Sequence, residues 1–181
     1  MIPRSPAQLT FQVVQLHELP QIKRAVQAAF VWDTQTLETI FADHDTGGST
    51  TLLEYEAGRL VGILTIRWHS HYPPFRDRGI PLIQNIEIRY HDRGRGLGNA
   101  LLERAEQEIA RRSPLAGLCV GIFDEYGRAQ RLYAKRGFIP DGRGVCKRHT
   151  PLRYGEQVRI EHDLLLWLIK DVADLSASTS D

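Results

Sequence analysis

A glycine-rich run separates an apolar stretch from a long helical pattern, and this junction limits the folds open to the chain. The run reads RGRGLG and spans residues 93–98. Residues 82–90 before it predict a strand. Residues 97–112 predict an amphipathic helix with apolar Leu97, Leu101, Ala105 and Ile109. A strand that enters a helix through glycines is typical of an α/β domain that binds an anion at the junction.

The chemistry of this loop indicates a phosphate or pyrophosphate ligand. Glycines let the backbone approach an anion closely, and the helix N-terminus adds partial positive charge. Arg93 and Arg95 add formal charge. A Walker loop would need G-K-S/T, which is absent, and a dinucleotide fingerprint would need glycine where Asn99 stands. From this motif alone, a plain strand-to-helix turn without a ligand is an equal alternative.

Patterns in the remaining chain predict one α/β domain with a mixed sheet. Predicted strands cover residues 11–16, 50–56, 60–68, 118–123 and 158–169, the last interrupted near His162. Predicted helices cover residues 20–30, 34–41 and 128–136, with Gly137 suited to the left-handed position after the last. Residues 69–79 and 141–157 predict loops. We expect the domain to span residues 1–174 and residues 175–181 to form a disordered tail.

Composition narrows the class of protein further. The 181 residues carry 23 Lys and Arg against 22 Asp and Glu, a balance that argues against general nucleic-acid binding. No apolar run predicts a membrane span, and the N-terminal residues lack the apolar core of a secretory signal. Cys119 and Cys146 do not suggest a disulfide framework, although one bridge between them stays open. We therefore expect a cytoplasmic location.

Two motifs of the chain resemble those of one enzyme family. Arg93, Gly96 and Gly98, directly after a predicted strand, match the pattern Q/R-x-x-G-x-G/A. Residues 129–138 (AQRLYAKRGF) match A-x-x-L-Y-x-K-x-G-F and also follow an apolar strand. In this order, the two patterns resemble the GNAT superfamily of N-acetyltransferases. The resemblance covers residues 50–138, and the segments on either side carry no signature.

The resemblance implies a fold, a co-substrate and a reaction. The fold would be α/β (α+β), with a mixed, mostly antiparallel central sheet flanked by helices on both faces. Acetyl-CoA would be the co-substrate, no metal would be needed, and a primary amine would receive the acetyl group directly in a ternary complex. The acceptor would be a small molecule or a peptide, and homodimers are common in the superfamily. The residues implied to hold the pyrophosphate of coenzyme A are Arg93, Gly94, Arg95, Gly96, Leu97, Gly98 and Asn99.

The resemblance also assigns catalytic groups. The backbone of Ile86, Glu87 and Ile88 would hold the thioester where the next strand splays away, with the Ile86 amide as the oxyanion donor. The alternative is that these amides simply pair within the sheet. Tyr133 would donate a proton to the leaving thiolate, and the alternative is a core tyrosine on an amphipathic helix.

The general base of the family has no counterpart here. Many members carry a glutamate early in the strand before the loop, but residues 81–85 contain no acid. Others carry one on the following strand, where this chain has Gly121, and a family asparagine corresponds to Tyr126. Candidate substitutes are Glu87, Asp124, His69 and His71. Strand alternation places the Glu87 side chain on the opposite face from Ile86 and Ile88. An acceptor amine of low pKa would need no base.

The segment around residues 68–75 leaves two interpretations open. His69 and His71 resemble a metal pair, but no cysteine or clear acid completes the site, so we expect no metal. The aromatic side chains of this segment either line an acceptor pocket or pack onto the sheet; they are Trp68, His71, Tyr72 and Phe75.

Two other functions compete with the enzyme. The missing base leaves a coenzyme A-binding module or sensor as an alternative. The RGRG stretch suggests an RNA-directed protein, which the near-neutral charge opposes.

Overall fold

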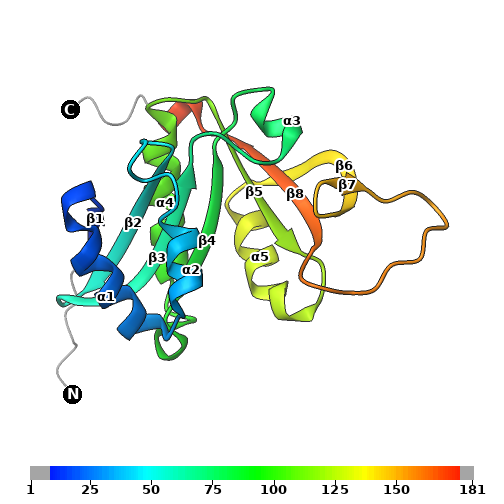
Figure 1. The fold of residues 1–181 in the computed structure, drawn as a ribbon. Helices are drawn as coiled ribbons and strands as arrows, with labels where there is room; N and C mark the ends of the chain where they lie inside the picture. The colour runs from blue at the N-terminus through cyan, green and yellow to red at the C-terminus, as the bar shows by residue number, and fades with distance from the viewer. Residues whose placement is uncertain (1–8, 176–181) are drawn as a thin grey trace, which may run out of the picture. The chain divides into compact units, whose positions relative to one another are not determined.

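The computed structural model describes residues 9–175, which form one eight-stranded sheet with helices (Figure 1). The strand order in the sheet is β1-β2-β3-β4-β5-β8-β6-β7. The contacts of the chain gather in two compact units. Unit 1 contains the described residues up to Trp68 together with Gln84–Ala105, and unit 2 contains His69–Ile83 and the residues from Glu106 onward.

Three antiparallel strands form the sheet of unit 1: β1 (Leu9–Val13), β2 (Ser49–Glu56) and β3 (Arg59–Arg67). The β2–β3 hairpin turns at Ala57 and Gly58, both with positive φ, as a tight turn requires. A register shift between Glu54 and Tyr55 interrupts the pairing, so that Glu54 lies opposite Gly62. The predicted hairpin is therefore confirmed.

Two helices cover one face of these strands, α1 (Leu19–Phe30) and α2 (Thr34–Ile40), with the short η1 (Leu16–Glu18) before them (Figure 1). Ile22 and Val26 of α1 pack in one buried cluster with Leu53 of β2 and Ile63 of β3. The spacing of four between Ile22 and Val26 places both on the apolar stripe of the helix. Helix α2 begins where the carboxylate of Asp33 accepts the Thr36 amide at 2.7 Å.

The other face of unit 1 meets α4 (Leu97–Ala110), which follows β4 (Leu82–Ile88) and the short η2 (Tyr90–Asp92). Leu101 of α4 and Ile88 of β4 both approach Gly62, where an added Cβ would lie 2.8 Å from Ile88 and 3.2 Å from Leu101. Glycine at position 62 therefore lets the helix and strand pack closely over β3.

Unit 2 is built on β5 (Leu115–Gly121), β6 (Ile139–Lys147), β7 (Thr150–Pro151) and β8 (Leu164–Asp171). Its helices are α3 (Pro73–Arg76), η3 (Asp124–Tyr126) and α5 (Gly127–Lys135). Strand β8 pairs antiparallel with both β5 and β6, whereas β5 pairs in parallel with the first two residues of β4. The mixed, mostly antiparallel sheet predicted from the sequence is thus confirmed.

A buried ion-pair network joins three elements of unit 2. The carboxylate of Glu106 on α4 is fully buried and accepts hydrogen bonds from Arg136 after α5, at 3.1 and 2.5 Å. Lys170 of β8 donates to the same carboxylate at 2.6 Å. Since a buried carboxylate is costly without partners, two cations on one acid offset the cost of burying Glu106 inside the unit.

The structure corrects two predicted boundaries near the C-terminus. The predicted loop at residues 141–157 contains most of β6 and all of β7. Gly142 and Gly144 adopt positive φ where the β6–β8 register shifts, so glycines that indicated a loop instead form a strand irregularity. The predicted last strand begins at Leu164 rather than at residue 158. Of the predicted tail, Leu175 is described, and residues 176–181 lie outside the described residues.

Candidate functional site

The glycine-rich loop leads from η2 into α4 with a backbone that only glycine adopts readily. Gly94 has a φ of 82° and Gly96 a φ of 89°, both in the left-handed region. The space where a Cβ would stand is open at both positions. In the described part of the chain, the amides of Gly94, Arg95 and Gly96 donate to no acceptor. The loop therefore presents free N–H donors at the positive end of a long helix, an arrangement that suits an anion.

Both arginines of the loop are engaged with carboxylates in unit 1. Arg93 pairs with Glu87 and donates through Nε to the Ile88 carbonyl at 3.0 Å. Arg95 reaches Glu56 at 2.5 Å and Asp92 at 3.3 Å. These pairs shape the loop, and the backbone amides rather than free guanidinium groups carry most of its attraction for an anion.

Asp92 is the buried anchor of this loop. Arg59 of β3 donates to both of its oxygens, at 3.0 and 2.8 Å. The hydrogen bonds from Arg59 hold the pKa of the Asp92 carboxyl below its usual range, so it stays ionised. The carboxylate then fixes the turn between β4 and the glycine-rich loop.

Strand β4 is irregular just before the residues expected to bind the thioester. Asn85 adopts a φ of 54°, a left-handed conformation that is uncommon for a residue other than glycine. Such a residue in a strand rotates the following peptide groups out of the regular ladder. The residues of β4 that pair with β5 are Leu82 and Ile83, which precede this irregularity. The irregularity directly precedes Ile86, Glu87 and Ile88, the residues named from the sequence.

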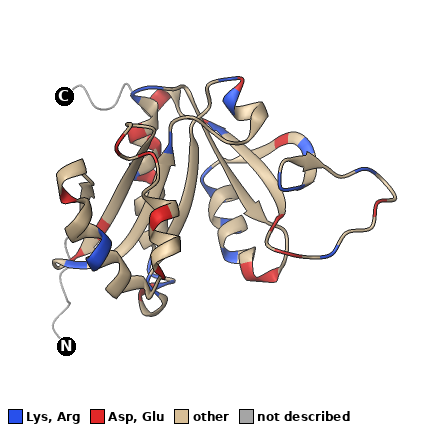
Figure 2. Ribbon diagram, viewed as in Figure 1, with Lys and Arg blue, Asp and Glu red and all other residues tan. Residues whose placement is uncertain are grey.

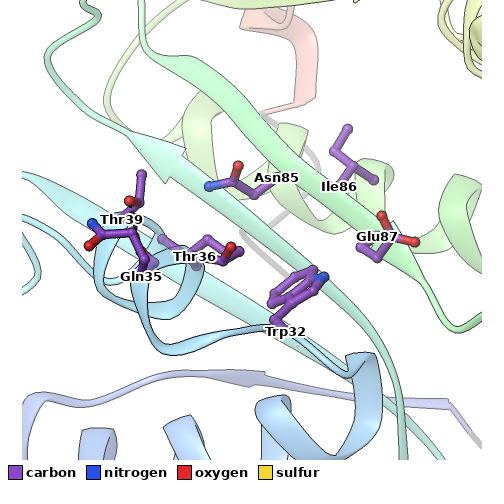
Figure 3. A pocket seen from close by; sticks show the side chains of 8 residues that line it. Trp32, Gln35, Thr36, Thr39, Asn85, Ile86 and Glu87 are labelled. Atoms are coloured by element: carbon purple, nitrogen blue, oxygen red, sulfur yellow. Dashed lines mark hydrogen bonds between the residues drawn. The ribbon is translucent and has the colours of Figure 1, made fainter. Parts of the chain in front are cut away.

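A pocket of about 330 Å³ lies in unit 1 between α2 and the irregular part of β4 (Figure 3). Figure 3 shows the Asn85 amide extending from β4 toward the α2 side chains. Glu87 and Ile86 both line this pocket, and the prediction that strand alternation places their side chains on opposite faces stays a prediction. The lining residues are Trp32, Gln35, Thr36, Thr39, Ile40, Asn85, Ile86 and Glu87.

Tyr133 lies on the buried face of α5 in unit 2, with 8% of its surface exposed. Figure 2 shows basic residues along this helix, and Arg128, Arg131 and Lys135 are exposed on it. Burial raises the pKa of the Tyr133 phenol, and the nearby Cys119 and Tyr126 raise it further. Tyr133 is therefore a neutral hydroxyl donor at neutral pH.

Tyr126 packs against the end of β5 at Gly121. A Cβ at Gly121 would lie 2.3 Å from one ring carbon of Tyr126 and 2.4 Å from another, so only glycine leaves room for this ring. The Tyr126 hydroxyl shares a hydrogen bond of 3.0 Å with Nδ1 of His162. The ring of Phe123 contacts both Tyr126 and His162, with centroid distances of 5.0 and 5.3 Å.

A family model described as the acetyltransferase (GNAT) family matches residues 14–138, more than half of the chain. The chain belongs to the GNAT acetyltransferase family. It is therefore an N-acetyltransferase-family enzyme, and the GNAT family uses acetyl-CoA and acetylates amine acceptors. No curated protein sequence matches the chain.

Solved structures with this GNAT fold share little sequence with the chain. The ribosomal-protein-S18-alanine N-acetyltransferase from Escherichia coli is 17% identical, with a TM-score of 0.62 over 92% of this chain and 95% of that one. Mutant forms of the spermidine/spermine N-acetyltransferase SpeG from Vibrio cholerae are 16% identical, with a TM-score of 0.62 over 96% and 100%. The Salmonella typhimurium protein yncA, solved with its cofactor acetyl-CoA, is 16% identical, with a TM-score of 0.60 over 96% and 99%. At such identities the likeness shows the fold alone.

The aromatic residues considered for an acceptor pocket in this GNAT enzyme pack elsewhere. Tyr72 stacks on Trp167 at 3.8 Å and donates to Asp141 at 2.7 Å, and Phe75 is buried beside them. Trp68 donates to Thr50 at 2.9 Å within unit 1. The sequence left open whether these aromatic side chains line an acceptor pocket or pack onto the sheet. Tyr72 and Phe75 pack onto the sheet.

His71 of the same segment packs against other rings of unit 2. His71 contacts the rings of His149 and Trp167, at centroid distances of 5.2 and 6.1 Å. Among the described residues, no group of three or more His, Cys, Asp or Glu side chains could hold a metal ion. No helix within residues 9–175 has the length and apolar character to cross a membrane.

Sequence reasoning missed two features. The α2 residues of the pocket carry no motif, because their role depends on the tertiary contact with β4. The partnership of Tyr126 and His162 links positions 36 residues apart. Gly121 was noted in the sequence only because it stands where some family members carry a glutamate. A glycine within a strand can also mark the close approach of another side chain, and this property could have indicated the contact with Tyr126.

Proposed function

We propose that the enzyme transfers an acetyl group from acetyl-CoA to the primary amine of a small molecule or peptide, directly within a ternary complex. The observation that carries this proposal is the loop at Gly94 and Gly96. Its left-handed glycines, open space and free amides at the start of α4 fit the pyrophosphate of coenzyme A. Acetyl-CoA supplies the activated acyl group, and the residues of the chain bind and orient the reactants.

The strand residues after Asn85 are proposed to hold the thioester. The Ile86 amide would donate to the carbonyl oxygen as negative charge develops there, and the backbone of Glu87 and Ile88 would align the pantetheine arm. Support comes from the left-handed Asn85, since it takes the following peptides out of the regular ladder. Backbone donors suit this role because they are rigid before the reaction begins.

Tyr133 is proposed to protonate the leaving thiolate. Burial raises the pKa of its phenol, which keeps the proton on the oxygen before the thiolate forms. A thiolate with a conjugate-acid pKa of about 8.5 is weaker than a free phenolate, so the transfer depends on positioning. The buried setting of Tyr133 on α5 supports that positioning.

The acceptor amine is proposed to enter the pocket between α2 and β4. Its lining is uncharged apart from Glu87, and its uncharged polar side chains are Gln35, Thr36, Thr39 and Asn85. Its one carboxylate, Glu87, is paired with Arg93. This charge balance favours an acceptor with a single ammonium group over a polyamine, which would need several carboxylates.

Thiol release from acetyl-CoA across a panel of amines tests the proposed function. The panel would contain small monoamines, peptides with free N-termini and polyamines. We expect amine-dependent thiol release with at least one monoamine or peptide and weaker release with polyamines. Coenzyme A binding without release for any amine would instead support the binding module or sensor that the missing family base suggests.

A further inference from the structure

The side chain of Glu87 lies on the face of β4 that meets α2. Its neighbour Ile88 reaches Gly62 of β3 beside Leu101 of α4, so Ile88 faces α4. Adjacent residues of a strand point to opposite faces, so Glu87 points toward the face that α2 covers. The pocket between α2 and β4 opens on that face, and Glu87 is one of the residues that line it (Figure 3).

The carboxylate of Glu87 is shared between this pocket and the glycine-rich loop. Among the described residues that line the pocket, Glu87 carries the only charge, so an acceptor ammonium depends on it for electrostatic attraction. The guanidinium of Arg93 pairs with the same carboxylate, and its Nε donates to the Ile88 carbonyl at 3.0 Å. An acceptor ammonium and Arg93 therefore compete for one carboxylate.

Arg93 is in turn the first residue of the loop proposed to bind the diphosphate of coenzyme A. It directly precedes Gly94, whose backbone N–H donates to no acceptor in the described part of the chain. A guanidinium binds phosphate oxygens with two parallel hydrogen bonds, and a diphosphate carries more negative charge than one carboxylate. The diphosphate and Glu87 therefore compete for one guanidinium.

Of the two arginines in the loop, Arg93 is the one that can exchange partners at little cost. Arg95 pairs with the side chains of Glu56 and Asp92, which are only 12% and 5% exposed. The side chains of Glu87 and Arg93 are 34% and 44% exposed. An ion pair so open to solvent contributes little to stability, whereas a cation withdrawn from a buried carboxylate leaves an uncompensated charge.

We propose that Glu87 binds the acceptor ammonium and that its ion pair with Arg93 couples the two substrate sites of the enzyme. This inference rests on the proposed function and deepens it. Without coenzyme A, Arg93 neutralises Glu87, and the pocket attracts a cation weakly. When Arg93 turns to the diphosphate, the Glu87 carboxylate becomes available to the ammonium group. The coupling is reciprocal, because an ammonium on Glu87 releases Arg93 for the diphosphate.

Calorimetric titration with coenzyme A tests the competition for Arg93 without any acceptor. Glu87→Gln removes the carboxylate that competes with the diphosphate, so we expect coenzyme A to bind about fivefold more tightly than to the wild type. Asp77→Asn removes the carboxylate of an exposed pair with Arg76 in unit 2 and should leave this affinity unchanged. Weaker binding by Glu87→Gln, as a purely structural role predicts, or unchanged binding would overturn the coupling.

Titration with an amine tests the competition for Glu87. The probe is the monoamine or peptide of the panel that gives the fastest thiol release, titrated alone and with enough coenzyme A to saturate each protein; coenzyme A has no acetyl group to transfer. We expect coenzyme A to tighten amine binding by the wild type about tenfold. Arg93→Gln should bind the amine tightly in both conditions, and Glu87→Gln weakly in both. Arg76→Gln, the matched control, should keep the wild-type coupling.

The coupling and the proposed function fail in different ways. Thiol release by the wild type, with an amine affinity that coenzyme A does not change, would refute the coupling alone. Coupling that persists in Arg93→Gln would do the same. Failure of the wild type to release thiol with any amine would refute the proposed function and the acceptor role of Glu87, while the affinity of Glu87→Gln for coenzyme A would still decide whether the carboxylate competes with the diphosphate.

Discussion

Glu54 is an unusual residue in unit 1, because its carboxyl group is fully buried. Within residues 9–175, neither of its side-chain oxygens has a hydrogen-bond partner. Burial, with a smaller contribution from Glu56, raises its pKa from 4.5 to about 7. The carboxyl lies against Gly62, beside the Ile88 and Leu101 side chains that connect β4 and α4 to the hairpin. Folding therefore favours the protonated form of Glu54.

The free energy of unfolding should fall as the pH rises through this range. The folded-state pKa of Glu54 lies above its unfolded value, so its stabilising contribution is complete below pH 4.5 and is lost as the pH approaches 7. Glu54→Gln should abolish this part of the pH dependence, which is on the order of 2 kcal/mol. Urea titrations at pH 5 and pH 8 measure the change. Glu38→Gln, at an exposed position, should leave the slope as it is, and an unchanged slope in Glu54→Gln would contradict the assignment.

Substitution of Tyr133 tests its proposed role as the proton donor. Tyr133→Phe keeps the buried ring on α5 and removes only the proposed proton donor. We expect kcat to fall roughly 100-fold, while the dissociation constant for coenzyme A changes less than threefold. Steady-state kinetics and calorimetry measure the two quantities. Full turnover in Tyr133→Phe would show that the residue belongs only to the core.

Among the elements, α4, α5 and β8 depend on the Glu106 network in unit 2. Glu106→Gln leaves the guanidinium of Arg136 and the ammonium of Lys170 without their shared carboxylate. Removing one partner of a buried ion pair costs about 3–5 kcal/mol, so the midpoint of urea unfolding should fall strongly. Glu103→Gln, at an exposed position of the same helix, is the matched control. Equal stability of the two variants would show that the buried network contributes little.

Elements with clear periodicity could be predicted from the sequence, and those with mixed signals could not. The alternating hairpin and the amphipathic α4 were both predicted, because burial on one face imposes a period that a single sequence shows. Strand β6 was missed, since Gly142 and Gly144 indicate a loop unless the partner strand is known. The start of β8 was predicted too early, because residues 158–163 have strand-like composition, whereas the strand and its pairing with β6 begin at Leu164.

For the molecule as a whole, the sequence predicted the family through two short motifs, and the family match over residues 14–138 agrees. The motif residues have local roles in loop and helix geometry, so the motifs can be recognised from the sequence alone. The pocket and the Tyr126–His162 pair depend on tertiary contacts between distant segments, which no local pattern encodes. The prediction of a single domain over residues 1–174 stays a prediction.

Calorimetric titration with coenzyme A is the most direct test of the central claim, which is that the loop at Gly94 and Gly96 binds a pyrophosphate. Gly96→Ala adds a side chain at a φ of 89° and should strain the loop by about 1–2 kcal/mol. Gly142→Ala adds the same group at a φ of 90° in β6 and serves as the matched control for strain. We predict measurable binding by the wild-type enzyme, at least tenfold weaker binding by Gly96→Ala, and wild-type binding by Gly142→Ala. No binding of coenzyme A by the wild-type protein, or equal affinity in all three proteins, would contradict the account.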